Sequence, residues 1–155
     1  MLKRACVQVS GVLATMHRLG FAHLDVKPGN ILQSRQDERV FKLGDFGLAT
    51  RTDGCLEVED GDRLYLAPEL LAGDHSDLCA TDVFSLGIAL FELVTGIALE
   101  HDGEQYTVLR SGQALKLPAT ISAAFGSVLQ VRLTEFPLQN SFAPPMSRLL
   151  SPRRL

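Results

Sequence analysis

A nearly continuous apolar run constrains the fold of this chain more than any other feature. From Thr81 to Ile97 almost every side chain is apolar, so the helix that this run predicts must be surrounded by protein. The longest apolar stretch, Val83 to Leu99, is seventeen residues interrupted by Glu92. It is shorter than the roughly 20 residues that span a bilayer, which favours a buried core helix over a membrane span.

Weaker signals before this run predict a helix, a hairpin and a long loop. Residues 2–19 carry apolar side chains at helical spacing (Ala5, Val9, Val12, Leu13 and Met16), and Gly20 ends the pattern. Apolar steps at residues 31–32 and 40–43, separated by a polar turn, predict a small β-hairpin. Residues 44–79 lack periodicity except for a short helix opening at Pro68, which is typical of a functional loop.

After the core helix the pattern weakens and then stops. Helices are expected near 104–111 and near 122–133, the second with Ser122 as its N-cap. The last twenty residues are rich in proline, serine and arginine, so we expect residues 132–155 to form a disordered tail. The fold class is therefore mainly α with one small hairpin, in a single domain over residues 1–131.

The composition mainly argues against certain partners and kinds of site. The chain has 155 residues, a formal net charge of −3 and 21% charged residues, so neither nucleic acid nor a membrane surface is an expected partner. Three widely separated cysteines (Cys6, Cys55 and Cys79) argue against a zinc site or a disulfide framework. No secretory signal is visible, and we expect an intracellular protein of the nucleus or cytoplasm.

Residues 23–30, His-Leu-Asp-Val-Lys-Pro-Gly-Asn, combine the groups that phosphoryl transfer from ATP requires. Asp25 is the candidate base for an acceptor hydroxyl, Lys27 the candidate cation on the transferred phosphate, and Asn30 a candidate Mg²⁺ ligand. A lone aspartate would be a solvated loop carboxylate, but the complete spacing favours catalysis. Fifteen residues after Asn30, Asp45-Phe46-Gly47 supplies a second candidate Mg²⁺ ligand in Asp45.

With these motifs and Ala67-Pro68-Glu69 in the same order, residues 2–131 resemble a eukaryotic protein kinase. The resemblance implies the helical C-terminal lobe of the kinase fold, ATP and Mg²⁺ as cofactors, and a protein substrate. It also implies that residues 23–30 are the catalytic loop and that Asp82 braces this loop from below. No glycine-rich loop, strand lysine or helix glutamate precedes the motifs, so the N-terminal β-lobe is expected to be absent and the chain alone inactive.

Departures from the common kinase pattern indicate a subfamily. Leu24 stands where many kinases have an arginine that receives the activating phosphate, which argues against activation by loop phosphorylation. Asp62 replaces the usual threonine near the catalytic aspartate and should alter substrate docking. Together with the acidic residues 57–62, these features resemble the Wee/Myt kinases, which inhibit cyclin-dependent kinases and delay mitosis. That resemblance implies a cyclin-dependent kinase as the partner.

Two alternative functions and the partner of Glu69 remain open from the sequence alone. The chain is also compatible with an ordinary serine/threonine kinase, or with a catalytically inactive module that binds a partner kinase or substrate. Kinases of this type usually pair the glutamate of Ala-Pro-Glu with a later arginine, but here residues 133–137 lead into the proline-rich tail. No partner for Glu69 can be assigned, and an unpaired buried carboxylate would weaken the domain.

Overall fold

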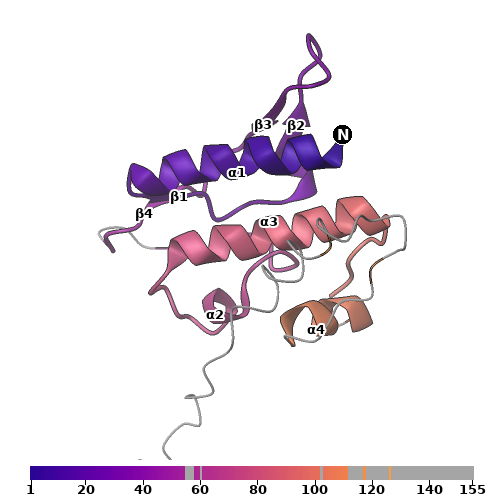
Figure 1. Ribbon diagram of the computed structural model, residues 1–155. Coiled ribbons are helices and arrows are strands. Elements are labelled where there is room, and N and C mark those ends of the chain that lie inside the picture. Colours follow the sequence, from indigo (N-terminus) through magenta and orange to yellow (C-terminus); the bar gives the residue numbers. More distant parts are fainter. Residues whose placement is uncertain (55–57, 60, 102, 112–116, 118–125, 127–155) are drawn as a thin grey trace, which may run out of the picture.

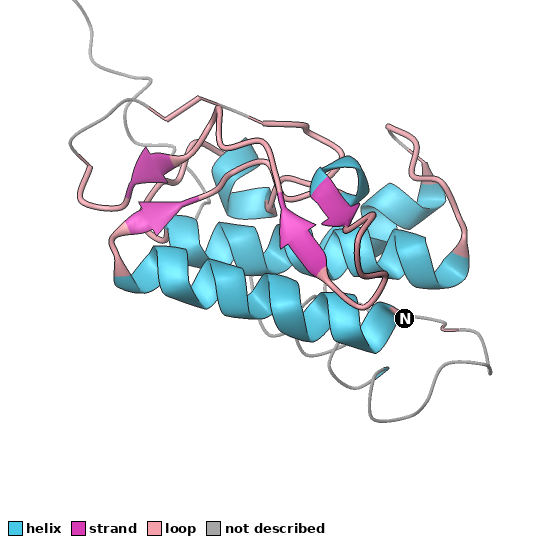
Figure 2. Ribbon diagram, turned by 90° about the horizontal axis from the view of Figure 1, so that it is seen from above, coloured by secondary structure: helices cyan, strands magenta, loops and turns pink. Residues whose placement is uncertain are grey.

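The central feature of the fold is a pair of long helices, α1 and α3, that lie side by side (Figures 1 and 2). The computed structural model describes residues 1–54, 58–59, 61–101, 103–111, 117 and 126. Helix α1 spans Leu2–Arg18, and α3 spans Leu78–Thr95. Both helices and the hairpin were predicted from sequence, and the mainly helical fold is confirmed. The predicted helix at 122–133, with Ser122 as its N-cap, and the tail at 132–155 lie outside the described residues, apart from Gly126.

Helix α3 is the core of the domain. Eleven of its residues are buried, and its side chains belong to three apolar clusters. Leu86 and Leu90 pack with Val9 and Leu13 of α1, whereas Phe84, Ile88 and Phe91 pack toward α4. By length and composition α3 could cross a membrane, but 61% of it is buried inside the domain. It is therefore the buried core helix that the sequence predicts.

The ends of α3 are set by two local interactions. Asp77 caps the first turn, because its Oδ1 accepts a hydrogen bond from the Ala80 amide at 2.9 Å. Gly96 ends the helix in a left-handed conformation with φ of 69°, which a glycine adopts without steric cost. The helix therefore begins three residues before Thr81 and ends two residues before Ile97, the bounds predicted from the apolar run.

Two small antiparallel sheets lie beside α1. The hairpin pairs β2 (Ile31–Gln33) with β3 (Phe41–Leu43), and Ile31 is opposite Leu43. The second sheet pairs β1 (Phe21–Ala22) with β4 (Thr50–Arg51). This second pairing was not predicted, because each strand has only two residues and the partners are far apart in sequence.

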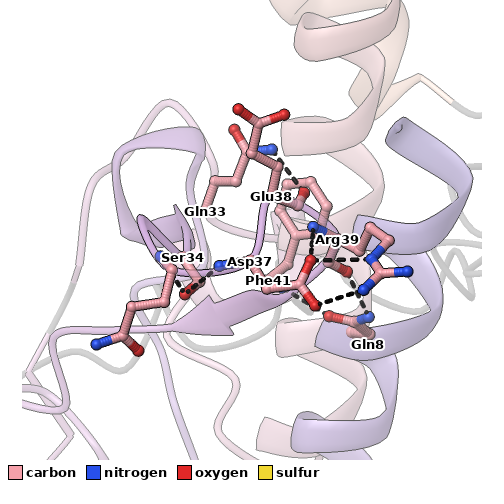
Figure 3. Close-up of polar contacts among 8 residues, drawn as sticks. Gln8, Gln33, Ser34, Asp37, Glu38, Arg39 and Phe41 are labelled. Carbon is pink, nitrogen blue, oxygen red and sulfur yellow. Dashed lines mark hydrogen bonds and ion pairs between the residues drawn. The ribbon is translucent and has the colours of Figure 1, made fainter.

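Helix α1 fixes the position of the hairpin through Gln8 (Figure 3). The Gln8 side chain donates to the Arg39 carbonyl at 3.0 Å and accepts from the Phe41 amide at 2.6 Å. In the turn itself, Ser34 Oγ accepts from the Asp37 amide, and the Asp37 carboxylate accepts from the backbone and side chain of Arg39. The hairpin is therefore tied to the long helix as well as closed on itself.

Two short helices complete the described part of the chain. Helix α2 spans Pro68–Leu71, with Pro68 in its first turn as predicted, and α4 spans Glu104–Arg110. Leu109 of α4 is buried with Phe84 and Phe91 of α3. In the segment between β4 and α2, Leu64 and Tyr65 pack against this same cluster.

Candidate active site

The loop His23–Asn30 is held in place from below by the carboxylate of Asp82. Asp82 is fully buried on α3, and its Oδ2 accepts from the His23 amide while its Oδ1 accepts from the Leu24 amide, both at 2.8 Å. His17 at the end of α1 contacts the same Oδ2 through Nε2 at 2.8 Å. Two consecutive amides that bond one carboxylate fix the entry to the loop, which is the bracing role that the resemblance implied for Asp82.

His23 joins this loop to Gly44, the residue before the motif Asp45-Phe46-Gly47. Its Nε2 lies 3.1 Å from the Gly44 carbonyl, and its Nδ1 lies 3.3 Å from the Asp25 amide. Both contacts are hydrogen bonds when the ring is neutral with its hydrogen on Nε2, because Nδ1 must then accept from the amide. The ring also packs edge-on against Phe46, with centroids 5.1 Å apart. His23 therefore couples the positions of Asp25 and Asp45.

Asp25, Lys27 and Asn30 meet at one carboxylate oxygen. Oδ2 of Asp25 lies 2.9 Å from Lys27 Nζ and accepts from Asn30 Nδ2 at 2.8 Å. The Asn30 amide also donates to the Asp25 carbonyl at 2.8 Å. The short 3₁₀ helix Pro28–Asn30 (η1) makes the turn that brings Asn30 back over Asp25.

The pKa of Asp25 reflects opposing effects. Burial raises the pKa of this carboxyl, but hydrogen bonds from Lys27 and Asn30, the Lys27 charge and the Asp62 amide together hold it below its ordinary value. The carboxylate therefore stays ionised at neutral pH. An ionised carboxylate beside an ammonium group can orient a hydroxyl and accept its proton.

The hairpin brings Asn30 next to Asp45. The Gly44 amide donates to the Asn30 carbonyl at 2.9 Å, directly beyond the last strand pair, so Asp45 follows a residue bonded to Asn30. Asp45 has a left-handed backbone with φ of 59°, and its exposed carboxylate accepts from the Gly47 amide through Oδ1.

The side chains of Asn30 and Asp45 fit the ligand chemistry of Mg²⁺. The Asn30 nitrogen is used by Asp25, which leaves its Oδ1 without a donor among the described residues. Oδ2 of Asp45 is likewise without a donor in this part of the chain. Amide and carboxylate oxygens are the donors that Mg²⁺ prefers, and the ion keeps its other positions for phosphate oxygens and water.

Comparison with known proteins assigns the family. The family described as "Protein kinase domain" matches residues 1–148. The chain belongs to the protein kinase family.

Its relatives include two Wee1-like protein kinases. The chain is 40% identical to the one of Oryza sativa subsp. japonica, over 91% of this chain and 26% of that protein. It is 42% identical to that of Arabidopsis thaliana over 72% of this chain, and 44% identical to the mitosis inhibitor protein kinase mik1 of Schizosaccharomyces pombe over a similar share. The similarity to the Wee kinases inferred from the motifs is confirmed. The chain spans about a quarter or less of the length of these three relatives.

Leu24 is part of an apolar cluster in this chain. Leu24 is 1% exposed and packs with Ala22, Leu66, Leu70 and Leu78. Leu48 and Val58, from the segment between the second motif and α2, lie against the same cluster. The side chain thus joins the catalytic loop to that segment by apolar contact.

The end of the acidic residues 57–62 approaches the catalytic loop closely. A Cβ added at Gly61 would lie 2.3 Å from the Leu24 carbonyl oxygen, so only glycine fits there without backbone movement. The next amide, that of Asp62, lies 3.4 Å from Asp25 Oδ1. The Asp62 carboxylate accepts from the Leu64 amide, and so closes its own turn.

Glu69 has no assigned partner here either. Its Oε1 is buried without a hydrogen bond among the residues that the structure describes. Burial raises the pKa of the Glu69 carboxyl, and the nearby Asp74 and Asp77 raise it further against one backbone hydrogen bond. The missing partner of Glu69 that the sequence indicates is therefore also missing among the described residues.

Two contributors to the site were missed by sequence reasoning. In the sequence, His17 is only a residue near the end of a predicted helix, and His23 is only the first residue of the motif. The close approach of Gly61 to Leu24 depends on the tertiary structure. In the sequence, only the presence of a glycine among the motifs of this loop could have indicated it.

Proposed function

We propose that this chain provides the phosphoryl-transfer centre of a protein kinase. The observation that carries the proposal is the meeting of Lys27 and Asn30 on one oxygen of Asp25. Transfer of a phosphoryl group to a hydroxyl requires a positioned base, a cation and an amide close together. The activity of the whole protein is a proposal, since the chain spans about a quarter of its Oryza relative.

Each candidate residue has a distinct role. Asp25 orients the acceptor hydroxyl and takes its proton, because its carboxylate is ionised and held by two donors. Lys27 balances negative charge on the group being transferred. Asn30 and Asp45 hold Mg²⁺, which when bound neutralises charge on the ATP phosphates.

The acceptor we propose is a cyclin-dependent kinase, and the effect is a delay of entry into mitosis. Relatives of this chain are named Wee1-like kinases and mitosis inhibitor kinases, which supports this choice. A nuclear or cytoplasmic location is part of the same proposal.

The test uses the protein as its gene encodes it, with ATP, Mg²⁺ and a purified cyclin-dependent kinase. We expect one phosphate per acceptor on a hydroxyl side chain, located by mass spectrometry. Lys27→Met should reduce the rate about 100-fold, because it removes charge stabilisation at the transferred group. Binding of the acceptor with no phosphate transfer by the unmodified protein would contradict the proposal and favour the non-catalytic module.

A further inference from the structure

Arg110, at the end of α4, binds backbone carbonyl groups of the segment that follows Asp62. Its Nη2 donates to the carbonyls of Leu64 and Leu66, each at 2.8 Å, and to that of Arg63 at 3.3 Å. Its Nη1 lies 3.4 Å from the Tyr106 carbonyl on its own helix. None of the ion pairs found in the described ranges involves Arg110. Among the described residues, the charged guanidinium is thus hydrogen-bonded to backbone carbonyls and not to a carboxylate.

The surroundings of the guanidinium are apolar and aromatic. It lies 3.8 Å from the centre of the Tyr106 ring and 5.7 Å from that of Phe84. Its Nε is buried without a partner among the described residues. In the part of the chain that the structure describes, the guanidinium is thus held by backbone carbonyls and ring faces instead of by a carboxylate. Its planar set of donors fixes the carbonyls that it binds in one arrangement.

The segment that Arg110 holds is connected to the catalytic carboxylate. Its first residue follows Asp62, whose amide lies 3.4 Å from Asp25 Oδ1. Tyr65 in the middle donates its hydroxyl hydrogen to Glu92 of α3 at 2.5 Å. A protein acceptor that delivers a hydroxyl to Asp25 must lie next to this backbone, because Asp62 contacts Asp25 directly.

We propose that Arg110 is a positioning residue for the protein acceptor. By binding three carbonyls of residues 63–66, it fixes the shape of the surface beside Asp25 on which the acceptor chain lies. The proposal rests on the kinase function proposed above. It assigns Arg110 no contact with ATP or with the transferred phosphate.

The kinetic test compares Arg110→Met and Arg110→Lys with Arg39→Met in the protein as its gene encodes it. Arg39 is an exposed arginine of the hairpin turn, paired with Asp37, and serves as the matched control. We expect Arg110→Met to raise the KM for the protein acceptor about tenfold, because hydrogen bonds from a charged donor are lost. The KM for ATP should stay unchanged, and lysine should restore part of the acceptor KM.

Amide hydrogen exchange provides a second readout that needs no activity. In Arg110→Met the amides of Leu64 and Tyr65 should exchange faster, since the turn that protects them loses its fixed carbonyls, while those of α1 should not change. Arg110→Lys should show the same change to a smaller extent, and it replaces the methionine variant if that one does not fold. Unchanged exchange at both amides, or an equal rise in the KM of ATP and acceptor, would overturn the proposal. Absence of turnover in the unmodified protein would instead contradict the kinase function.

Discussion

The amide of Leu24 donates a 2.8 Å hydrogen bond to Oδ1 of Asp82, a residue 58 positions later in the chain. Leu24 makes this bond from a left-handed backbone with φ of 61°, a conformation that costs about 1–2 kcal/mol for a residue with a side chain. The bond and the burial of the leucine side chain offset that cost. The catalytic loop therefore takes its shape from α3 and not from its own residues alone.

Replacing Asp82 should unfold the loop and weaken the domain. Asp82→Ala leaves the buried amides of His23 and Leu24 without acceptors, so we expect a loss of at least about 3 kcal/mol in the free energy of unfolding. Urea denaturation measures this. Asp77→Ala on the same helix removes only an N-cap and should cost about 1 kcal/mol. Equal losses in the two variants would show that Asp82 does not brace the loop.

Leu24→Arg tests whether the loop can accept the arginine that many kinases have. The leucine is buried among apolar side chains, so the guanidinium would lose water without gaining a partner, and we expect a loss of about 3 kcal/mol or more. Leu24→Met should cost less than about 1.5 kcal/mol, because it conserves volume and polarity. An arginine variant as stable as the methionine variant would contradict the apolar packing role of Leu24.

Local sequence patterns predicted the helices well and the site contacts less well. The helical spacing of Ala5, Val9 and Leu13 predicted α1 correctly, because these are the side chains that α1 buries. The start of α3 was placed late, since Asp77 lies outside the apolar run and its capping bond shows only in three dimensions.

The site depends on contacts between distant segments, and these have no local signal. The motif spacing was enough to select Asp25, Lys27, Asn30 and Asp45, and the structure brings the first three together and places Asp45 beside Asn30. Their catalytic roles remain predictions. Arg110 could not be selected, because its acceptors are backbone carbonyls more than forty residues earlier in the chain.

Glu69 predicts a specific pH dependence of stability. Its carboxyl pKa is raised in the folded chain, so its contribution to stability is present below the unfolded pKa and is lost as pH rises through the folded pKa. Glu69→Gln removes this ionisation. We expect the variant to be more stable than the unmodified chain at pH 7, and the difference to shrink toward pH 4. A variant that is less stable at pH 7 would show that Glu69 is ionised and paired.

Two glycines should respond in opposite directions to alanine. Gly61→Ala places a methyl group 2.3 Å from the Leu24 carbonyl, so the segment must move away from the loop, and we expect both a lower thermal midpoint and a lower phosphorylation rate. Gly11 lies exposed on α1 with nothing within 4 Å of an added Cβ. Gly11→Ala should stabilise the chain by about 0.5–1 kcal/mol. A stabilising Gly61→Ala would contradict the close approach.

The most direct test of the central claim is the rate of γ-phosphate transfer from ATP to the protein acceptor in Asp25→Asn. Asparagine keeps the shape of the side chain but cannot take the hydroxyl proton, so the rate should fall by about 100-fold or more. Asp37→Asn, at an exposed carboxylate of the hairpin turn, should stay within about twofold of the unmodified protein. A rate for Asp25→Asn equal to that of Asp37→Asn would contradict the assignment of Asp25 as the catalytic base.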